Sequence, residues 1–231
     1  IPGRSSRCTA HSVIKLWFQL KGQPNKLKYT PYPVKEDKLP IHVNQQEFIK
    51  MIQACQNHKH RVIIALMFDC GLRVSEVINL KLNDIDYSNK LININQAKGN
   101  KDRRVKLSAA LQAIISIYVQ TYNPQIWLLN GQAPKGASVI TQYSVRSCQQ
   151  IIKALRLKAQ ITKPFTCHKF RHGFAMNLLE NGTDIENIAD LMGHKNTKTT
   201  KIYARMNNTI IQKTESPLEQ ILKNNHKLLP A

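Results

Sequence analysis

The stretch HKFRHGFAMNLLENGTDIENIADLMGHKNTKTTKIY, residues 168–203, sets most of what this sequence predicts. Apolar residues recur every four positions in its first half, at Phe170, Phe174 and Leu178. This spacing predicts a helix over residues 167–180 with one face in the core. Glycines then separate two further helical segments, which are predicted over residues 184–192 and 198–206.

Polar residues occupy another face of the first predicted helix. His168, Arg171 and His172 are spaced i, i+3 and i+4, so two imidazoles and a guanidinium lie on one side. A solvated basic face is one interpretation, but the apolar stripe beside it places this charge at the edge of the core, where it needs an anionic partner. A zinc site is disfavoured because the Glu of an HExxH motif is absent and a cation, Arg171, lies beside both histidines.

Two helices are predicted in the region that follows residue 40. Asn44 and Glu47 form a capping-box pattern, and apolar residues then recur at helical spacing over residues 45–56. An almost wholly apolar run over residues 61–69 predicts a buried core helix that ends at the glycine after it. Beyond these two, a further helix is expected to resume near Arg73.

Three short strands follow, with turn residues between them. They are predicted over residues 85–87, 91–95 and 103–107, and the short connections favour an antiparallel sheet. Ser108 and Ser144 are expected to cap two further helices, which end near residues 121 and 159. The predicted fold class is therefore mainly α with a small antiparallel three-stranded β-sheet.

The charge of the chain indicates its partner. The 231 residues include 34 Lys and Arg against 14 Asp and Glu, which gives a formal net charge of +20. Such an excess favours a polyanion, and nucleic acid is the leading candidate. An anionic membrane surface is the rival interpretation, but no run approaches the ~18 consecutive apolar residues of a spanning helix. The five cysteines form no CxxC pair, which is typical of reduced, mostly buried residues in a cytosolic protein.

Four motifs follow one another along the chain. They are CGLRVSEVINLKLNDID with Arg73, QAKGNKDRRVKL with Lys98, HKFRH with Arg171, and MGH with a tyrosine, Tyr203, nine positions after its histidine. In this order and spacing they resemble the signature of the tyrosine recombinase, or phage integrase, family over about residues 40–210, nearest to its Xer-like branch. Phe170 and Met192 replace leucines of the family pattern, and both changes are apolar swaps that should leave the site usable.

The resemblance implies that six residues fill the family's catalytic positions: Arg73, Lys98, His168, Arg171, His194 and Tyr203. Cleavage of a phosphodiester by a tyrosine builds negative charge at phosphorus, and preorganised guanidinium groups suit that task. His168 is then the candidate base for the tyrosine hydroxyl, and His194 is a donor to a non-bridging oxygen. Lys98 is the candidate acid for the leaving 5′-oxygen, with Lys101 as its competitor.

Other residues near these positions are expected to support them. Glu76 is interpreted as an orienter of Arg73, and His172 as a hydrogen-bonded partner behind the site. The remaining cations are expected to contact the DNA backbone or to form a solvated face: Lys101, Arg103, Lys169, Lys195, Lys198 and Lys201.

Composition and resemblance together divide the chain into four parts. Residues 1–22 are interpreted as the remnant of a preceding core-binding domain, and residues 23–40 as a basic, proline-containing linker. Residues 41–210 are the expected catalytic domain. Residues 211–231 hold a short tail helix that we expect to dock on its own body or to be exchanged between protomers.

The sequence thus predicts a site-specific recombinase or integrase that cleaves DNA through a covalent 3′-phosphotyrosyl bond. Its expected partners are double-stranded DNA and three further copies of itself, forming a homotetramer on two DNA sites, with no membrane, metal or other cofactor. It is expected in the cytoplasm, at the nucleoid. Three alternatives remain: a type IB topoisomerase, a resolvase of hairpin ends, and a non-catalytic DNA-binding protein with this fold.

Overall fold

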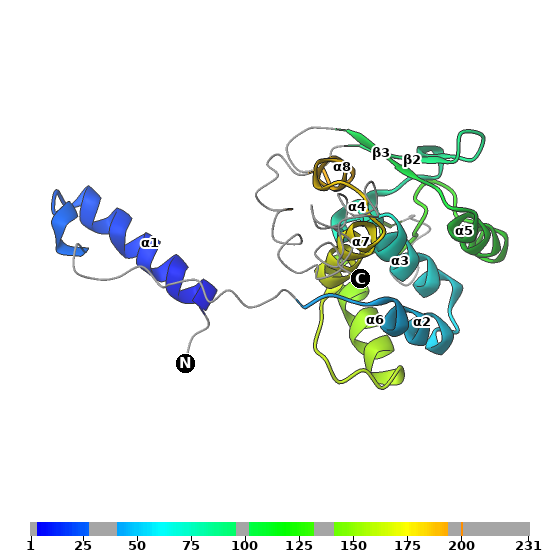
Figure 1. The fold of residues 1–231 in the computed structure, drawn as a ribbon, viewed down its shortest axis with the longest axis horizontal. Helices are drawn as coiled ribbons and strands as arrows, with labels where there is room; N and C mark the ends of the chain where they lie inside the picture. Colours follow the sequence, from blue (N-terminus) through cyan, green and yellow to red (C-terminus); the bar gives the residue numbers. More distant parts are fainter. Residues whose placement is uncertain (1–3, 28–40, 96–101, 132–140, 194–199, 201–231) are drawn as a thin grey trace, which may run out of the picture. The chain divides into compact units, whose positions relative to one another are not determined.

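A computed structural model gives the structure of the protein over residues 4–27, 41–95, 102–131, 141–193 and 200 (Figure 1). The chain forms two compact units, Ile1–Leu39 and Pro40–Ala231. The first unit contains helix α1 (Arg4–Leu20) and a short 3-10 helix, η1 (Pro24–Leu27). Apolar character in the sequence marked only the last part of α1, because its first two turns are largely polar. Within the described ranges, no helix combines the length and apolar character needed to cross a membrane.

The second unit is mainly helical within its described residues. Its helices are α2 (Gln45–Ala54), α3 (His58–Asp69), α4 (Val74–Asn79), η2 (Leu82–Asp84), α5 (Ala109–Tyr122), α6 (Val145–Lys158), α7 (Cys167–Glu180) and α8 (Ile185–Leu191). Its strands are β1 (Ile85–Asp86), β2 (Leu91–Ile94) and β3 (Arg103–Lys106). The predicted fold class, mainly α with a three-stranded antiparallel sheet, is confirmed.

Side-chain caps mark the starts of α2, α3, α5 and α6. Asn44 accepts a hydrogen bond from the Glu47 amide over 2.8 Å and Glu47 accepts one from the Asn44 amide over 2.9 Å, so the predicted capping box opens α2. Helix α3 begins at His58, earlier than predicted, because Asn57 caps it through the His60 amide. Two other predicted caps are confirmed at the starts of α5 and α6: Ser108 and Ser144.

The sheet places one face of β3 toward the core. Strand β2 lies between β1 and β3, and both pairings are antiparallel. Val105 of β3 lies opposite Ile92, and Arg103 lies opposite Ile94. Side chains that lie directly opposite share a face, and those two positions apart on a strand do so too. Arg103 therefore points to the same inner side as Val105, Ile92 and Ile94, which are all at most 2% exposed.

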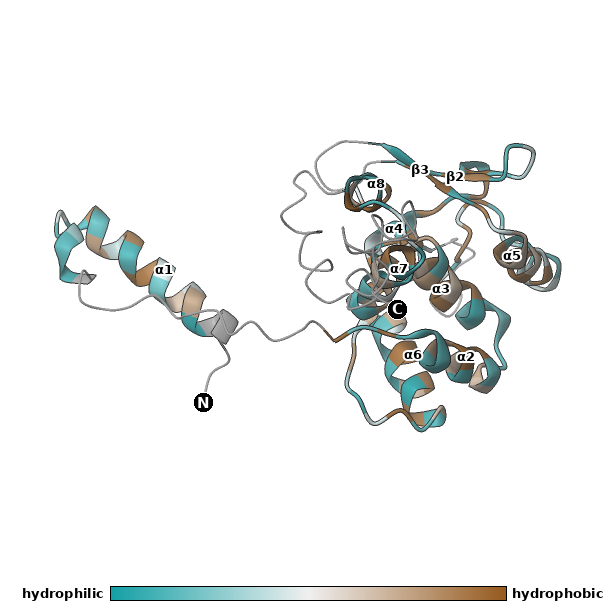
Figure 2. Cartoon of the chain, in the orientation of Figure 1, coloured by the Kyte–Doolittle hydropathy of each residue, from teal (hydrophilic) through white to brown (hydrophobic). Residues whose placement is uncertain are grey.

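Helix α3 runs through the core of the second unit. Its residues 62–67 are at most 3% exposed, which confirms the predicted buried helix. It packs against α5 and α7, and Figure 2 shows hydrophobic residues along these helices. The cysteines are free thiols, and four of them are buried, as the sequence predicted: Cys55, Cys70, Cys148 and Cys167.

The turn after α3 requires a glycine. Gly71 has a φ of +60°, and a Cβ at this position would lie 2.4 Å from the ring of Phe174 on α7. The absence of a side chain lets α7 pack directly on the turn. Arg171 of α7 donates to the Gly71 carbonyl, so the turn that leads to α4 is held to α7.

Gly71→Ala should lower the free energy of unfolding by about 2–4 kcal/mol, because left-handed strain and overpacking against Phe174 add together. Gly182→Ala is the matched control, since Gly182 has a φ of +84° but nothing within 4 Å of its Cβ position. Strain alone should make the control lose about 1 kcal/mol. Urea denaturation of both variants measures the difference, and equal losses would contradict the packing account.

Candidate active site

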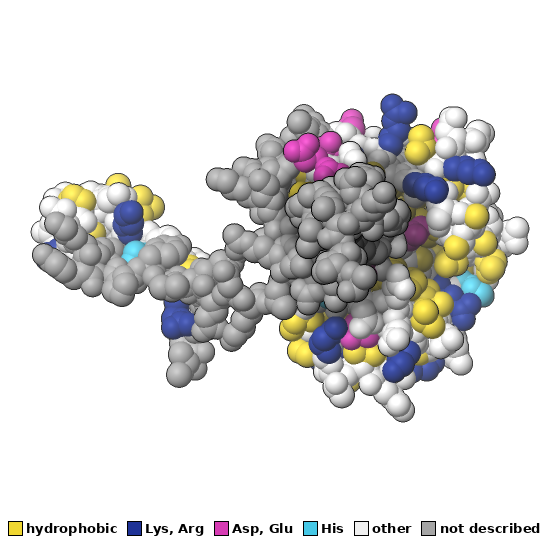
Figure 3. All heavy atoms as spheres, viewed as in Figure 1, with side chains coloured by type: hydrophobic (Ala, Val, Ile, Leu, Met, Phe, Trp, Pro, Cys, Tyr) yellow, Lys and Arg dark blue, Asp and Glu magenta, His cyan; other side chains and the backbone are white. Residues whose placement is uncertain are grey.

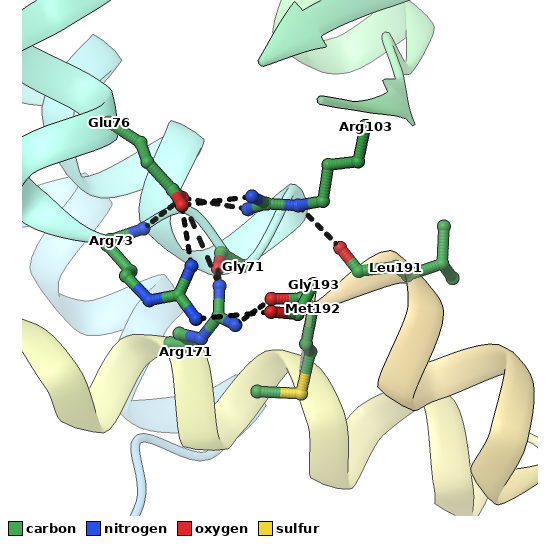
Figure 4. Close-up of polar contacts among 8 residues, drawn as sticks. All are labelled: Gly71, Arg73, Glu76, Arg103, Arg171, Leu191, Met192 and Gly193. Carbon is green, nitrogen blue, oxygen red and sulfur yellow. Dashed lines mark hydrogen bonds and ion pairs between the residues drawn. The ribbon is translucent and has the colours of Figure 1, made fainter. Parts of the chain in front are cut away.

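Arg73 stands at the start of α4, where Glu76 holds it. The Arg73 amide donates to Glu76 Oε2 over 2.8 Å, and Nη1 of the Arg73 side chain donates to Glu76 Oε1 over 2.7 Å. A carboxylate at the third helical position reaches back to the cap residue in this way. Nη2 points to the Gly193 carbonyl at 3.5 Å (Figure 4). The Arg73 side chain remains 21% exposed, so part of it is open to a ligand.

Arg103 holds the same carboxylate from β3. Its Nη1 donates to Glu76 Oε1 over 2.9 Å, its Nη2 donates to Oε2 over 2.7 Å, and its Nε donates to the Leu191 carbonyl over 2.9 Å. The side chain is only 7% exposed. The sequence assigned Arg103 to DNA contact and missed this arrangement. Arg103 lies two positions from the apolar Val105, so both side chains share one face of the strand, and this spacing was the signal that could have placed Arg103 inward.

Glu76 is ionised, and its carboxylate accepts as many hydrogen bonds as it can. Its two oxygens accept four hydrogen bonds, two from Arg73 and two from Arg103, which is the full capacity of a carboxylate. Burial alone would raise the pKa of Glu76, but the hydrogen bonds and charge of Arg103, together with the bonds from Arg73, lower that pKa to about 2. The structure therefore gives Glu76 the geometry that an orienting role requires.

Arg171 lies beside this pair and joins two main-chain segments. It is 1% exposed, and its Nη1 donates to the Gly71 carbonyl over 2.6 Å. Its Nη2 donates to the Met192 carbonyl, after the end of α8. Nη1 also lies 4.0 Å from Glu76 Oε2. The third guanidinium of the cluster is thus fixed by the turn after α3 and by the end of α8.

The cluster has more positive charge than it can neutralise internally. Among the described residues, three guanidinium groups share the carboxylate of Glu76, and arginine stays protonated in proteins. Such a surplus at a partly buried position is suited to an anion, and guanidinium groups match phosphate oxygens. Figure 3 shows further Lys and Arg side chains spread over the visible face of the second unit, with acidic ones gathered near α8.

Two histidines of α7 accompany the arginines. The rings of His168 and His172 are 4.7 Å apart and meet edge to face. Burial, followed by the charges of Arg171, Lys169 and Arg73, lowers the pKa of His168 below its ordinary value. Burial and the neighbouring His168 lower the pKa of His172 to about 3. Both rings are therefore neutral at pH 7, and a neutral imidazole can accept a proton.

Several predicted site residues fall outside the described part of the chain: Lys98, Lys101, His194, Lys195, Lys198, Lys201 and Tyr203. The helix predicted over residues 198–206 lies outside it too, apart from Thr200, which is buried. Lys169, expected to contact DNA, is half-buried on α7, and its carbonyl accepts from the Val43 amide over 3.2 Å. No group of three metal-ligating side chains occurs among the described residues.

Similar proteins identify the family of this chain. The model of the phage integrase family matches residues 42–209. A putative integrase/recombinase of Sinorhizobium fredii, y4eF, is 36% identical over 189 residues, which are 82% of this chain and 73% of that protein. Tyrosine recombinase XerA of Pyrococcus horikoshii is 29% identical over 197 residues, which are 84% of this chain and 67% of that protein.

A solved structure shares the fold. The crystal structure of the XerH site-specific recombinase bound to palindromic difH substrate is similar with a TM-score of 0.64 and 22% identity, and covers 79% of this chain. This chain spans 54% of that one. The chain therefore belongs to the phage integrase family, the tyrosine recombinases, which are enzymes that cleave and rejoin DNA strands.

Glu76→Gln should lower the free energy of unfolding by about 3 kcal/mol, because it leaves buried guanidinium charge without its counter-ion. Chemical denaturation at pH 7 measures this loss. Glu186→Gln, which removes an exposed carboxylate from α8, is the control and should change stability by less than about 0.5 kcal/mol. A loss for Glu76→Gln as small as that of the control would show that the carboxylate does not hold the cluster.

Stability should rise with pH between about pH 5 and 6.5, partly through His172. The unfolded chain binds a proton at His172 below its ordinary pKa of 6.5, whereas the folded chain binds it only near pH 3. Protonation therefore favours the unfolded state across this window, by up to about 1 kcal/mol per pH unit. When urea denaturation is repeated at several pH values, the free energy of unfolding should rise less steeply with pH for His172→Gln than for the unaltered chain. Parallel slopes would mean that His172 is solvated and unshifted.

Proposed function

We propose that this chain is the catalytic part of a site-specific DNA recombinase or integrase that cleaves DNA through a covalent 3′-phosphotyrosyl bond. One observation carries the proposal: Arg73, Arg103 and Arg171 converge on Glu76 and leave surplus positive charge. A phosphodiester supplies the matching anion. The net charge of +20 favours a long polyanion over a small phosphate ester as the substrate.

Arg73 and Arg171 act on the scissile phosphate in this proposal. Attack at phosphorus adds negative charge to the non-bridging oxygens, and preorganised cations stabilise that charge without reorganising. Arg73 is the more accessible of the two, because Glu76 takes only part of its donor capacity. Arg171 acts from a fixed position on α7. His194 donates to a non-bridging oxygen of the same phosphate.

Proton transfer completes the proposed cleavage step. The Tyr203 hydroxyl oxygen forms a bond to phosphorus, its proton passes to neutral His168, and the bond from phosphorus to the 5′-oxygen breaks. Lys98 gives that oxygen a proton, with Lys101 as the alternative donor. The released 5′-hydroxyl of a partner strand then attacks the phosphotyrosine. Its oxygen bonds to phosphorus and gives its proton back to the lysine, while the bond from phosphorus to the Tyr203 oxygen breaks and that oxygen takes its proton back from His168. The reaction invokes neither a metal nor a nucleotide, because the protein linkage conserves the energy of the broken bond.

The proposed assembly contains four copies of the chain on two DNA duplexes in the cytoplasm, at the nucleoid. Residues 41–210 form the catalytic domain, and residues 211–231 pass between neighbouring copies. Residues 23–40 link this domain along the DNA to residues 1–22, which belong to a core-binding domain in this proposal. The basic composition of the linker supports its placement along the DNA.

The test is to trap the covalent intermediate. The chain is incubated with a pool of nicked duplexes drawn from the DNA that flanks its coding region. Cleavage close to a nick releases a short fragment, so the 5′-hydroxyl is lost and the adduct accumulates. The unaltered chain should give an adduct that survives denaturation, and Tyr203→Phe should bind DNA without forming one.

The outcomes separate the alternatives. Binding without an adduct would contradict the enzymatic proposal and leave a DNA-binding protein. An adduct followed by relaxation of supercoiled DNA without strand exchange would identify a topoisomerase. An adduct that yields closed hairpin ends would identify a hairpin-end resolvase. Exchange of strands between two duplexes supports the proposed recombinase.

A further inference from the structure

Arg103 engages all three nitrogens of its guanidinium group. Its guanidinium uses Nη1, Nη2 and Nε in hydrogen bonds to Glu76 and to the Leu191 carbonyl, at 2.7–2.9 Å. Its stem also packs closely, because a Cβ at Gly193 would lie 3.3 Å from Arg103 Cδ. Contact with a DNA backbone would require it to leave these partners. Arg104, the next residue on β3, is exposed and shows what a freely solvated cation of this strand looks like.

The fork of Arg103 limits what Arg73 can do. Arg103 binds both oxygens of Glu76, and two parallel bonds of this kind fix the plane of a carboxylate. The Arg73 side chain is left with one hydrogen bond to Glu76, from Nη1 to Oε1, because Oε2 already accepts from the Arg73 amide and from Arg103. Without Arg103, the Arg73 guanidinium could close its own two-bond pair with Glu76. Such a pair would turn its donors away from a phosphate.

We infer that Arg103 is a positioning residue for strand cleavage, which sets Arg73 through Glu76 and fixes the end of α8, from which the chain continues to His194. The inference rests on the proposed function and assigns to Arg103 a role other than DNA contact. The hydrogen bond from Arg103 Nε to the Leu191 carbonyl is the second contact of this arrangement, since it ties the same guanidinium to α8. One side chain thereby aligns two parts of the site that come from distant parts of the sequence.

The test compares variants on the nicked substrate that the unaltered chain cleaves. At saturating protein, Arg103→Met should slow adduct formation by up to about 100-fold, the effect expected when a reacting group is displaced by about 1 Å. DNA affinity and the salt dependence of binding should not change, whereas loss of a phosphate contact would reduce the salt slope by about one. Arg104→Met removes the same charge from the exposed face of β3 and should cleave at the unaltered rate.

Two further variants connect the effect to Glu76. Arg103→Lys keeps the charge but not the fork, so it should restore only part of the rate. If Arg103 acts through Glu76, then Glu76→Gln combined with Arg103→Met should cleave no more slowly than the slower single variant. Arg103→Lys keeps a cation in place, so its cleavage rate, alone and combined with Glu76→Gln, tests the inference should Arg103→Met fail to fold.

Each outcome decides something. Multiplied losses in the double variant, or an unaltered cleavage rate for Arg103→Met or Arg103→Lys, would overturn the inference. So would a reduced salt slope with an unaltered rate at saturation, since that result would restore Arg103 to DNA contact. Absence of an adduct from the unaltered chain would instead overturn the proposed function, and the inference with it.

Discussion

The carboxylate of Glu76 is the constraint on which the described site depends. It lies among three arginines, is 6% exposed, and accepts hydrogen bonds from two of them. Like charges at this distance repel, so the cluster forms only because one anion lies within it. The same imbalance leaves positive charge for a ligand. Structure and function therefore share one requirement: the arginines must be held together without being neutralised.

The cluster also explains how the second unit is assembled. Its members come from α4, β3, α7 and the end of α8, and each brings its own element into place. Arg171 joins the turn after α3 to the end of α8, while Arg103 joins β3 to the same end. Glycine at position 71 lets α7 approach that turn closely. Apolar packing of α3 against α5 and α7 supplies the support behind these polar contacts.

The sequence predicted those features that local pattern determines. The apolar run of α3, the capping box at Asn44 and the alternation of β2 each follow from neighbouring residues, and all are present. The start of α3 was predicted too late because its first turn, with His58 and Lys59, is polar. The resemblance to the family identified which residues form the site. The structure brings three of them together: Arg73, Glu76 and Arg171.

Arg103 has a pairing with Glu76 that the sequence did not predict. Strand alternation was enough to turn it inward, but its partner lies 27 positions earlier, on another element. No local pattern states which buried carboxylate a buried cation will meet, because that depends on how a strand and a helix pack. A basic residue in a basic protein was therefore assigned to DNA.

A crystal structure of the chain trapped on nicked DNA through Tyr203 would show whether Glu76 and Arg103 hold Arg73 at the phosphate. Arg73 should lie about 3 Å from a non-bridging oxygen of the linked phosphate while Glu76 still binds it. Arg103 should still hold both oxygens of Glu76 and should not touch the DNA. A complex in which Arg103 leaves Glu76 to bind the DNA backbone, or in which Arg73 lies away from the phosphate, would contradict the account.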